Sequence, residues 1–254
     1  MRVLVCVKRV PMTGGRIVLT EDAQEIDTAH LGFTISPHEE CGIEEAARLI
    51  EAHGGESVVL TLGAAEAEEQ LRDAMALGID RALHLDSEGS EWDGQATAEA
   101  ITNAIRAEEA ASGTFDLVFF GNESADAGGF QVGIRVAHAL GRPCVTGLKG
   151  IAVEGSGVRC EQEVPGGRDV YRIPFPAIVT VKEGLNLPHY PSVPAKLRAQ
   201  RQPVDTATPA RQEQRLRKLR LVVPESRGKR AEVLGEGPAA AERVVEVLRE
   251  IGVA

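Results

Sequence analysis

Short aliphatic runs alternate with helix-like segments through the first 140 residues of the chain. Four runs have the character of buried strands, at residues 3–7, 57–62, 82–85 and 116–120. Four helix-like segments, in which apolar residues recur at helical spacing, lie between these strands and after the last one. The first follows Ser36-Pro37 and stops at Gly54-Gly55, and the others cover residues 65–77, 95–111 and 131–140. Strands and helices that alternate with short links predict an α/β fold, an open and mostly parallel sheet with helices on both faces.

The pattern changes after Pro143. Residues 148–181 carry β-rich runs separated by the turn sequences EGSG and PGG, which predicts antiparallel strands appended to the sheet. Residues 182–238 are rich in proline and predict an extended arm, and residues 240–251 predict one amphipathic helix. We therefore divide the chain into an α/β domain at 1–181 and a C-terminal region at 182–254. Within the first, residues 11–35 predict a turn and a small surface hairpin.

The stretch GNESADAGGFQVG at 121–133 follows the fourth predicted strand. In an open parallel sheet, ligands bind at the carboxyl ends of strands, where this loop meets the residues after Cys6, residues 36–39 and residues 61–63. Gly128-Gly129 leave backbone N–H groups bare just before a helix, which suits a phosphate or another anion. The same residues also suit a plain turn with Asp126 as a helix cap, and the spacing does not decide between the two, because it is neither GxGxxG nor GxxxxGK[ST].

The composition of the chain argues against nucleic-acid binding and membrane insertion. The 254 residues are 43% hydrophobic but only 4% aromatic, which predicts an aliphatic core, and the net charge of −10 argues against nucleic acid as a partner. No stretch has the roughly 20 apolar residues that membrane insertion needs. Four widely spaced cysteines without a CxxC pair predict a reduced, cytoplasmic protein.

No catalytic arrangement emerges from the residues. HExxH, GxSxG and the loop that splits ATP in adenylating enzymes are missing, and Glu123 with Asp126 lacks a third ligand for a metal. The chain is therefore expected to bind a nucleotide without consuming it, with no metal and no catalytic residues.

Five segments in the same order closely resemble the beta subunit of electron transfer flavoprotein. They are VCVKRVP at 5–11, IEEAARL at 43–49, LRDAMALGIDRALHL at 71–85, DLVFFGNESADAGGFQVG at 116–133 and PAIVTVKEGLNLPHYPSVPAKLRA at 176–199. The resemblance covers about residues 1–200. It implies an α/β fold like that of the adenine nucleotide alpha hydrolases, and a heterodimer with an alpha subunit that holds most of the FAD. Such a carrier passes electrons from dehydrogenases to a quinone reductase or another acceptor, and its beta subunit binds AMP or a second FAD.

The resemblance also implies two sites. In the nucleotide pocket, Gln131 would donate to a phosphate and Asp126 would lie on a ribose hydroxyl or on the helix cap. The pocket residues carried over are Cys6, Ser36, Pro37, His38, Glu39, Leu62, Gly121, Asn122, Glu123, Ser124, Ala125, Asp126, Ala127, Gly128, Gly129, Phe130, Gln131 and Val132. The second site is a loop that docks into a partner dehydrogenase, formed by Leu185, Asn186, Pro188, His189, Tyr190 and Val193, with Val193 where the family has an anchoring leucine.

The chain departs from the family pattern in other places. Ser36-Pro37-His38-Glu39 stands where Asn-Pro-Phe-Asp is usual, Gln162 replaces an arginine between two glutamates, and Phe130 replaces a small or polar residue. These changes leave open which nucleotide fills the pocket and how the flavin potential is set. A stand-alone nucleotide-binding sensor or stress-type protein of the same fold is the alternative, but such a protein would not need the long arm.

Overall fold

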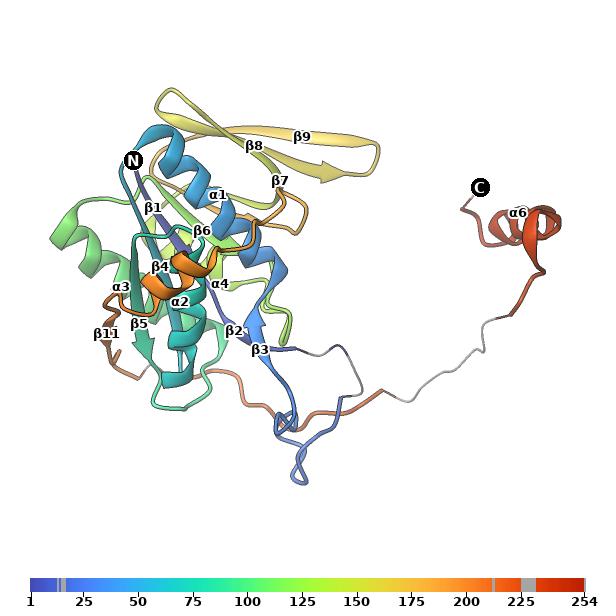
Figure 1. Ribbon diagram of the computed structural model, residues 1–254, viewed down its shortest axis with the longest axis horizontal. Helices are drawn as coiled ribbons and strands as arrows, with labels where there is room; N and C mark the ends of the chain where they lie inside the picture. The colour runs from blue at the N-terminus through green and yellow to red at the C-terminus, as the bar shows by residue number, and fades with distance from the viewer. Residues whose placement is uncertain (13, 15–16, 212, 225–231, 254) are drawn as a thin grey trace.

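The core of the molecule is a nine-stranded sheet. The computed structural model describes residues 1–254 apart from 13, 15–16, 212, 225–231 and 254 (Figure 1). The strand order is β11-β5-β4-β1-β6-β10-β7-β8-β9, parallel from β11 to β7 and antiparallel from β7 to β9. The strands are β1 (Arg2–Cys6), β4 (Glu56–Gly63), β5 (Arg81–Asp86), β6 (Leu117–Gly121), β7 (Cys144–Glu154), β8 (Gly157–Val164), β9 (Gly167–Pro174), β10 (Ala177–Val181) and β11 (Asp205–Ala207).

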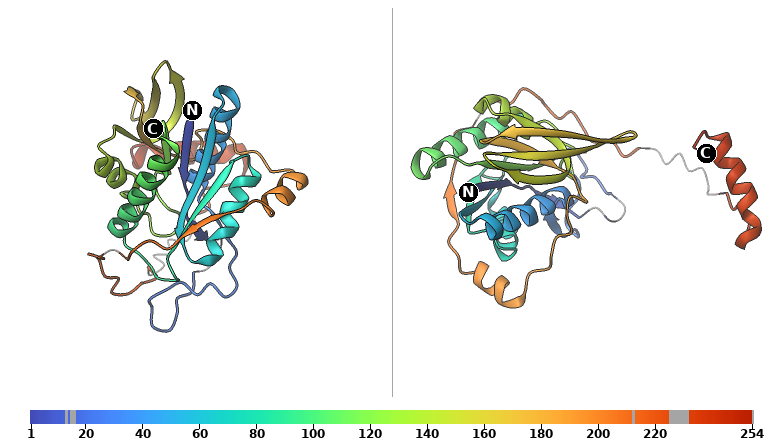
Figure 2. Two further views of the ribbon diagram at one scale, coloured as in Figure 1. Left: turned by 90° about the vertical axis from the view of Figure 1, so that its left-hand side faces the viewer. Right: turned by 90° about the horizontal axis from the view of Figure 1, so that it is seen from above.

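Helices cover both faces of this sheet, as the sequence predicts (Figure 2). The helices are α1 (Pro37–His53), the 3-10 turn η1 (Ala65–Ala67), α2 (Glu68–Ala76), α3 (Gly94–Ser112), α4 (Val132–Leu140), α5 (Val193–Ala199), the 3-10 turn η2 (Gly237–Ala240) and α6 (Ala241–Glu250). Because side chains alternate along a strand, Val5 of β1 belongs to the apolar cluster beneath α1 and α2, whereas Leu4 belongs to the cluster beneath α3 and α4. The open α/β fold is thereby confirmed.

One predicted strand lies elsewhere in the sheet. The antiparallel prediction for 148–181 is right for β8, β9 and β7 from Leu148 onward, but β10 lies between β6 and β7 and runs parallel to both. All five residues of β10, AIVTV, are buried. A continuous apolar run of this kind is typical of a central parallel strand, whose two faces are both covered.

The segment at 11–35 contains the predicted small hairpin. Leu19 and Ile26 form an isolated antiparallel bridge there. The strands β2 (Arg9–Pro11) and β3 (Phe33–Ile35) pair antiparallel at its base.

Much of the predicted arm packs on the body instead of extending from it. Helix α5 lies against α2, where the Arg72 guanidinium donates to the carbonyl of Ala199 at 2.7 Å, and β11 adds an edge strand to β5. Further along, the Asp93 carboxylate accepts from the backbone N–H groups of Arg215 at 2.7 Å and Leu216 at 2.9 Å. The predicted amphipathic helix is confirmed as α6, which stands apart from the body (Figure 1).

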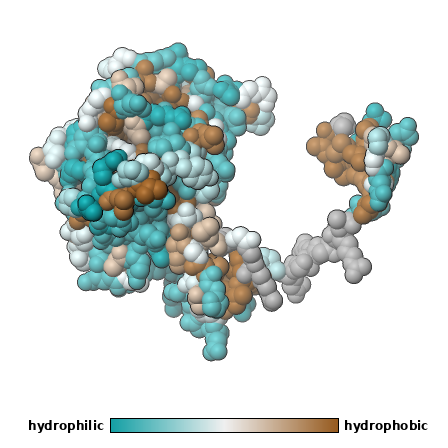
Figure 3. Space-filling model, in the orientation of Figure 1, coloured by the Kyte–Doolittle hydropathy of each residue, from teal (hydrophilic) through white to brown (hydrophobic). Residues whose placement is uncertain are grey.

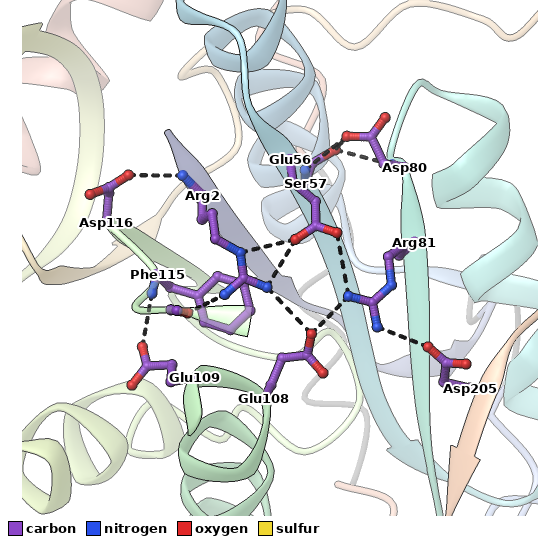
Figure 4. A network of polar contacts seen from close by, with 11 residues as sticks. Arg2, Glu56, Ser57, Asp80, Arg81, Glu108, Glu109, Phe115, Asp116 and Asp205 are labelled. Atoms are coloured by element: carbon purple, nitrogen blue, oxygen red, sulfur yellow. Dashed lines mark hydrogen bonds and ion pairs between the residues drawn. The ribbon is translucent and has the colours of Figure 1, made fainter. Parts of the chain in front are cut away.

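A network of charged side chains ties the amino ends of the strands together (Figure 4). The Arg2 guanidinium contacts Glu56 at 2.9 Å and Glu108 at 3.3 Å. The Arg81 guanidinium contacts the same Glu108 oxygen at 2.8 Å and Asp205 at 2.9 Å. The network therefore joins β1, β4, β5, α3 and β11. The two arginines share Glu108, and they also share Glu56, which Arg81 contacts at 3.3 Å.

Replacement of Glu108 by alanine should lower the free energy of unfolding by about 1–3 kcal/mol, because two arginines lose a hydrogen-bonded partner that is largely shielded from solvent. Urea unfolding measures the change. Glu154→Ala is the matched control, since Glu154 pairs with Arg172 at 2.9 Å on the surface and such pairs contribute about 0–1 kcal/mol. Equal losses in the two variants would contradict a structural role for the network.

Candidate functional site

The strand order places a topological switch point at the carboxyl ends of β1 and β6, and we call the region around it the crevice. These two strands are neighbours, but the crossover through α1 leads from β1 to β4 on one side, whereas the crossover through α4 leads from β6 to β7 on the other. In doubly wound sheets, ligands bind where the crossovers diverge in this way. The start of α1, the start of α4 and the two loops between them border the crevice.

Glu39 and Lys8 connect three of these loops. The buried Glu39 carboxylate, in the first turn of α1, accepts from the backbone N–H of Lys8 at 2.8 Å. The Lys8 ammonium forms an ion pair with Asp126 at 2.6 Å. At Gly121 a Cβ atom would lie 2.7 Å from Glu39 Cγ, so only glycine fits there. The residues after β1, the start of α1 and the loop after β6 are therefore in direct contact, as the sequence predicts.

Cys6 and Leu62 lie on the side of the sheet covered by α3 and α4. The Thr61 hydroxyl donates to the carbonyl of Val7 at 2.8 Å, and the N–H of Val7 donates to Leu60, which keeps the ends of β1 and β4 together. Burial, with a smaller effect of the Glu39 charge, raises the pKa of the Cys6 thiol well above its usual range. Cys6 therefore belongs to the apolar core at the end of β1, and its thiol is a poor nucleophile at neutral pH.

The glycine-rich loop at 121–133 is held to β10 by hydrogen bonds at its start, whereas several side chains in its second half are exposed to solvent. The Asn122 N–H donates to Val181 at 2.9 Å, and its side-chain oxygen accepts from the Thr180 hydroxyl at 3.0 Å. Further on, Gly128 adopts a positive φ of 60° and donates to the Ser124 carbonyl at 3.0 Å, whereas the N–H of Gly129 reaches the Ser124 hydroxyl only at 3.4 Å. The loop is thus an ordered turn around Ser124 that leaves Ala125, Ala127 and Phe130 exposed.

Helix α4 begins without a side-chain cap. Its N-cap residue is Gln131, whose side-chain oxygen accepts from Arg135 at 2.7 Å instead of from the helix N–H groups. The first-turn N–H groups, from Val132 onward, are those that an α-helix leaves without an internal partner. Asp126 bonds to the N–H of Ala127 at 2.7 Å and to Lys8, so the expectation that it caps this helix is wrong.

Two buried polar atoms at the start of α1 have no partner among the described residues. Ser36 is only 1% exposed, and its hydroxyl forms no hydrogen bond although the residue stands at the N-cap of α1. The Nδ1 atom of His38 is likewise buried and unpartnered, and Pro37 between them has no N–H to offer. Buried polar atoms without partners are costly, and at the edge of a crevice they are suited to a polar ligand.

The charge of the crevice depends on Glu39. Burial raises the pKa of Glu39 to about 8, although the N–H and the ammonium of Lys8 act in the opposite direction. For Asp126 burial is the largest single effect and acts to raise the pKa, but the charge of Lys8 and the hydrogen bonds to the carboxylate together outweigh burial and hold the pKa below its ordinary value. At neutral pH, Lys8 and Asp126 are therefore charged and Glu39 is mostly protonated.

The segment predicted to recognise a dehydrogenase is half anchored and half exposed. The Asn186 amide donates to the Cys41 carbonyl and to Glu45, both at 3.0 Å, and the His189 ring contacts Glu44 at 2.6 Å. Leu185 and Pro188 are partly buried, whereas Tyr190 is 97% exposed. Val193, 71% exposed, is the first residue of α5, a helix that the sequence reading had treated as loop.

Sequence reasoning missed Lys8. Its position two residues after Cys6, within the segment VCVKRVP, is the signal that could have placed it at the carboxyl end of β1. Among the residues that the structure describes, no group of three histidine, cysteine or acidic side chains could hold a metal ion. No helix within the described ranges is long and apolar enough to cross a membrane.

The fold and the crevice define a doubly wound α/β protein with a ligand site at its topological switch point. A family model described as "Electron transfer flavoprotein domain" matches residues 25–212. Over 207 residues, 81% of the chain, it is 33% identical to "Electron transfer flavoprotein subunit beta" of Bacillus subtilis (strain 168), and covers 78% of that protein. The chain belongs to the electron transfer flavoprotein family, whose members are electron carriers.

Two further relatives with the same name extend this finding. The protein of Syntrophomonas wolfei is 30% identical over 250 residues, which cover 98% of this chain and 96% of the relative. The protein of Mus musculus is 29% identical over 206 residues, which cover 81% and 80%. The match to the former includes the C-terminal region, so that region is shared with a named beta subunit.

Gly121→Ala should lower the free energy of unfolding by about 1–3 kcal/mol, because the added methyl group must displace the buried Glu39 side chain or the loop. Gly129→Ala is the control, since the nearest atom to a Cβ there is the Ser124 hydroxyl at 3.8 Å. Urea unfolding of both variants checks the prediction, which a Gly121→Ala protein as stable as the Gly129→Ala protein would refute.

Proposed function

We propose that the chain is the beta subunit of a heterodimeric electron transfer flavoprotein and binds an adenine nucleotide, AMP or a second FAD, in the crevice between β1 and β6. The alpha subunit would hold most of the FAD through which electrons pass from dehydrogenases to a quinone reductase or another acceptor. The observation that supports the proposal best is the switch point between β1 and β6, followed on one side by the uncapped start of α4 and on the other by the unpartnered atoms of Ser36 and His38 at the start of α1.

These residues fit a nucleotide by the chemistry of their free groups. The first-turn N–H groups of α4 are donors for a phosphate, and the positive end of the helix dipole adds to the attraction. The N–H of Gly129, whose contact with the Ser124 hydroxyl is long at 3.4 Å, could turn to the same phosphate. The Gln131 side chain uses its oxygen toward Arg135, which leaves its NH₂ group as a donor. The hydroxyl of Ser36 and the ring nitrogen of His38 could bond to the polar edge of an adenine or a ribose.

The chain would bind the nucleotide and would not itself carry out the redox steps. A flavin supplies the one- and two-electron steps when it is bound. The side chains of this chain near the crevice are a buried thiol, an ion pair and a mostly protonated carboxyl, and none is placed as an activated nucleophile. The four free cysteines fit a reducing compartment, and we propose the cytoplasm.

The nucleotide can be identified directly. Co-expression with an electron transfer flavoprotein alpha subunit from the same genome should give a one-to-one complex with the visible absorption of a flavin, and denaturation should release an adenine nucleotide. Released AMP or excess FAD tells which nucleotide the beta subunit holds. In the same complex, Gly129→Ala should weaken nucleotide binding about tenfold, because a side chain there blocks the close approach of the backbone to the phosphate.

Gly167→Ala on β9 is the matched control for that variant, since neither glycine has a positive φ and a Cβ atom fits at both positions without a contact shorter than 3.8 Å. It should bind nucleotide like the unmodified protein. The proposal fails if the chain purifies alone without flavin or nucleotide. A chain that binds an adenine nucleotide but does not associate with the alpha subunit would instead support the stand-alone nucleotide-binding protein.

We further propose that the exposed end of the segment 185–193 docks into a dehydrogenase. Its anchored half, fixed to α1 through Asn186 and His189, would hold Tyr190 and Val193 in place and so reduce the entropy lost on docking.

Val193→Asp should slow reduction of the complex by its dehydrogenase at least about tenfold, because a charge would have to be buried at the contact. The absorption spectrum should not change. Val170→Asp, at an exposed valine of β9, is the control and should leave the rate unaffected. Stopped-flow absorbance compares the rates, and equal slowing in both variants would count against docking through this segment.

A further inference from the structure

We propose that Glu39 couples nucleotide binding to a proton, so that the crevice binds the phosphate-bearing nucleotide with Glu39 protonated and loses affinity when Glu39 ionises. This inference rests on the proposed function and gives one residue of the same site a specific role. Glu39 would be a positioning and charge-setting residue, not a catalytic one.

The carboxyl group cannot turn out to solvent when it loses its proton. Glu39 is buried, its Oε2 atom accepts from the N–H of Lys8 at 2.8 Å, and its Cγ atom lies against Gly121. Its own N–H donates to Ser36 at 2.9 Å, which holds it at the start of α1. A negative charge on Glu39 therefore stays inside the crevice.

Contacts lead from Glu39 to the loop expected to hold the phosphate. Lys8 pairs with Asp126 at 2.6 Å, Asp126 lies two residues after Ser124 in this loop, and the Ser124 hydroxyl accepts from the N–H of Gly129 at 3.4 Å. The ionisable groups that act on Glu39 are Lys8 and Asp126, and Glu39 in turn acts on the Cys6 thiol. With Glu39 protonated, the charges of Lys8 and Asp126 cancel, whereas with Glu39 ionised the group carries a net negative charge toward an anion.

The ionisation of Glu39 falls in a different pH range from the ionisation of the Cys6 thiol and of the nucleotide phosphate. Burial raises the pKa of Glu39 to about 8, and the pKa of Cys6 is raised well above its usual range. The second pKa of a phosphate monoester is about 6, so the phosphate of AMP is already fully charged. Affinity should therefore be complete below about pH 7 and fall as the pH rises through about 8.

Isothermal titration calorimetry on the nucleotide-stripped complex tests the inference. The ligand is the nucleotide that the complex releases, AMP or FAD, and the pH runs from about 7 to 9.5. Kd of the unmodified protein should rise about tenfold, since a buried charge would repel the phosphate across the crevice. Measurements near pH 8 in two buffers of different ionisation enthalpy should show proton uptake on binding.

Glu39→Gln should bind with a Kd that does not change over this range, because glutamine stays neutral. Glu40→Gln is the matched control on the same turn of α1, since the charges that act on Glu40 belong to Glu183 and Asp73. It should follow the unmodified protein. Adenosine, which lacks the phosphate, should show a weaker pH dependence than AMP in the unmodified protein and in Glu40→Gln.

Thermal unfolding gives a readout that needs no ligand. Because the pKa of Glu39 is raised in the folded protein from about 4.5 to about 8, the unmodified protein should lose stability relative to Glu39→Gln between these pH values and then level off. No nucleotide binding at pH 7 would overturn the proposed function. If the unmodified protein and Glu39→Gln bind the nucleotide with the same pH profile, this inference alone is overturned. If Glu39→Gln does not fold, the absence of proton uptake by the unmodified protein overturns it.

Discussion

The position of β1 between β4 and β6 is the constraint on which the rest of the structure depends. In register, Cys6 stands opposite Leu60 on one side and Phe120 on the other. The residues after all three strands therefore emerge together at one edge, and Lys8 can reach both Glu39 and Asp126. A slip of one residue in this strand would turn Val3 and Val5 toward the opposite helices and would also separate the loops of the crevice.

Polar groups are paired at the amino ends of the strands, whereas some of them have no partner among the described residues at the carboxyl ends. At the amino ends of the strands, Arg2 and Arg81 meet three carboxylates, so each charge has partners (Figure 4). At the carboxyl ends, Ser36 and His38 keep buried atoms without partners. The first edge contributes stability, whereas the second leaves polar groups unsatisfied, a cost that a bound ligand can offset.

The sequence predicts the open α/β fold and the convergence of the loops, because both follow from strand periodicity and from the rule that ligands bind at strand ends. It does not place β10, because β10 follows two antiparallel strands in the chain and its return to the middle of the sheet between β6 and β7 depends on pairing with distant strands. Nor does it show that Asp126 bonds to Lys8 instead of capping α4. That choice depends on a contact between residues 118 positions apart, which no local pattern encodes. The roles of the two predicted site groups remain predictions, although the structure brings the pocket residues together.

The C-terminal region divides at the point where it stops bonding to the body. Up to Leu221, whose N–H donates to Ala23 at 2.7 Å, the chain is held by hydrogen bonds to the domain. Helix α6 has no buried residue, and its apolar side chains, including Val244, Leu248 and Ile251, stand exposed away from the body (Figures 1 and 3). A helix of ten residues is marginal in water on its own, so its apolar face needs a second surface. In the proposed heterodimer, the alpha subunit would supply that surface.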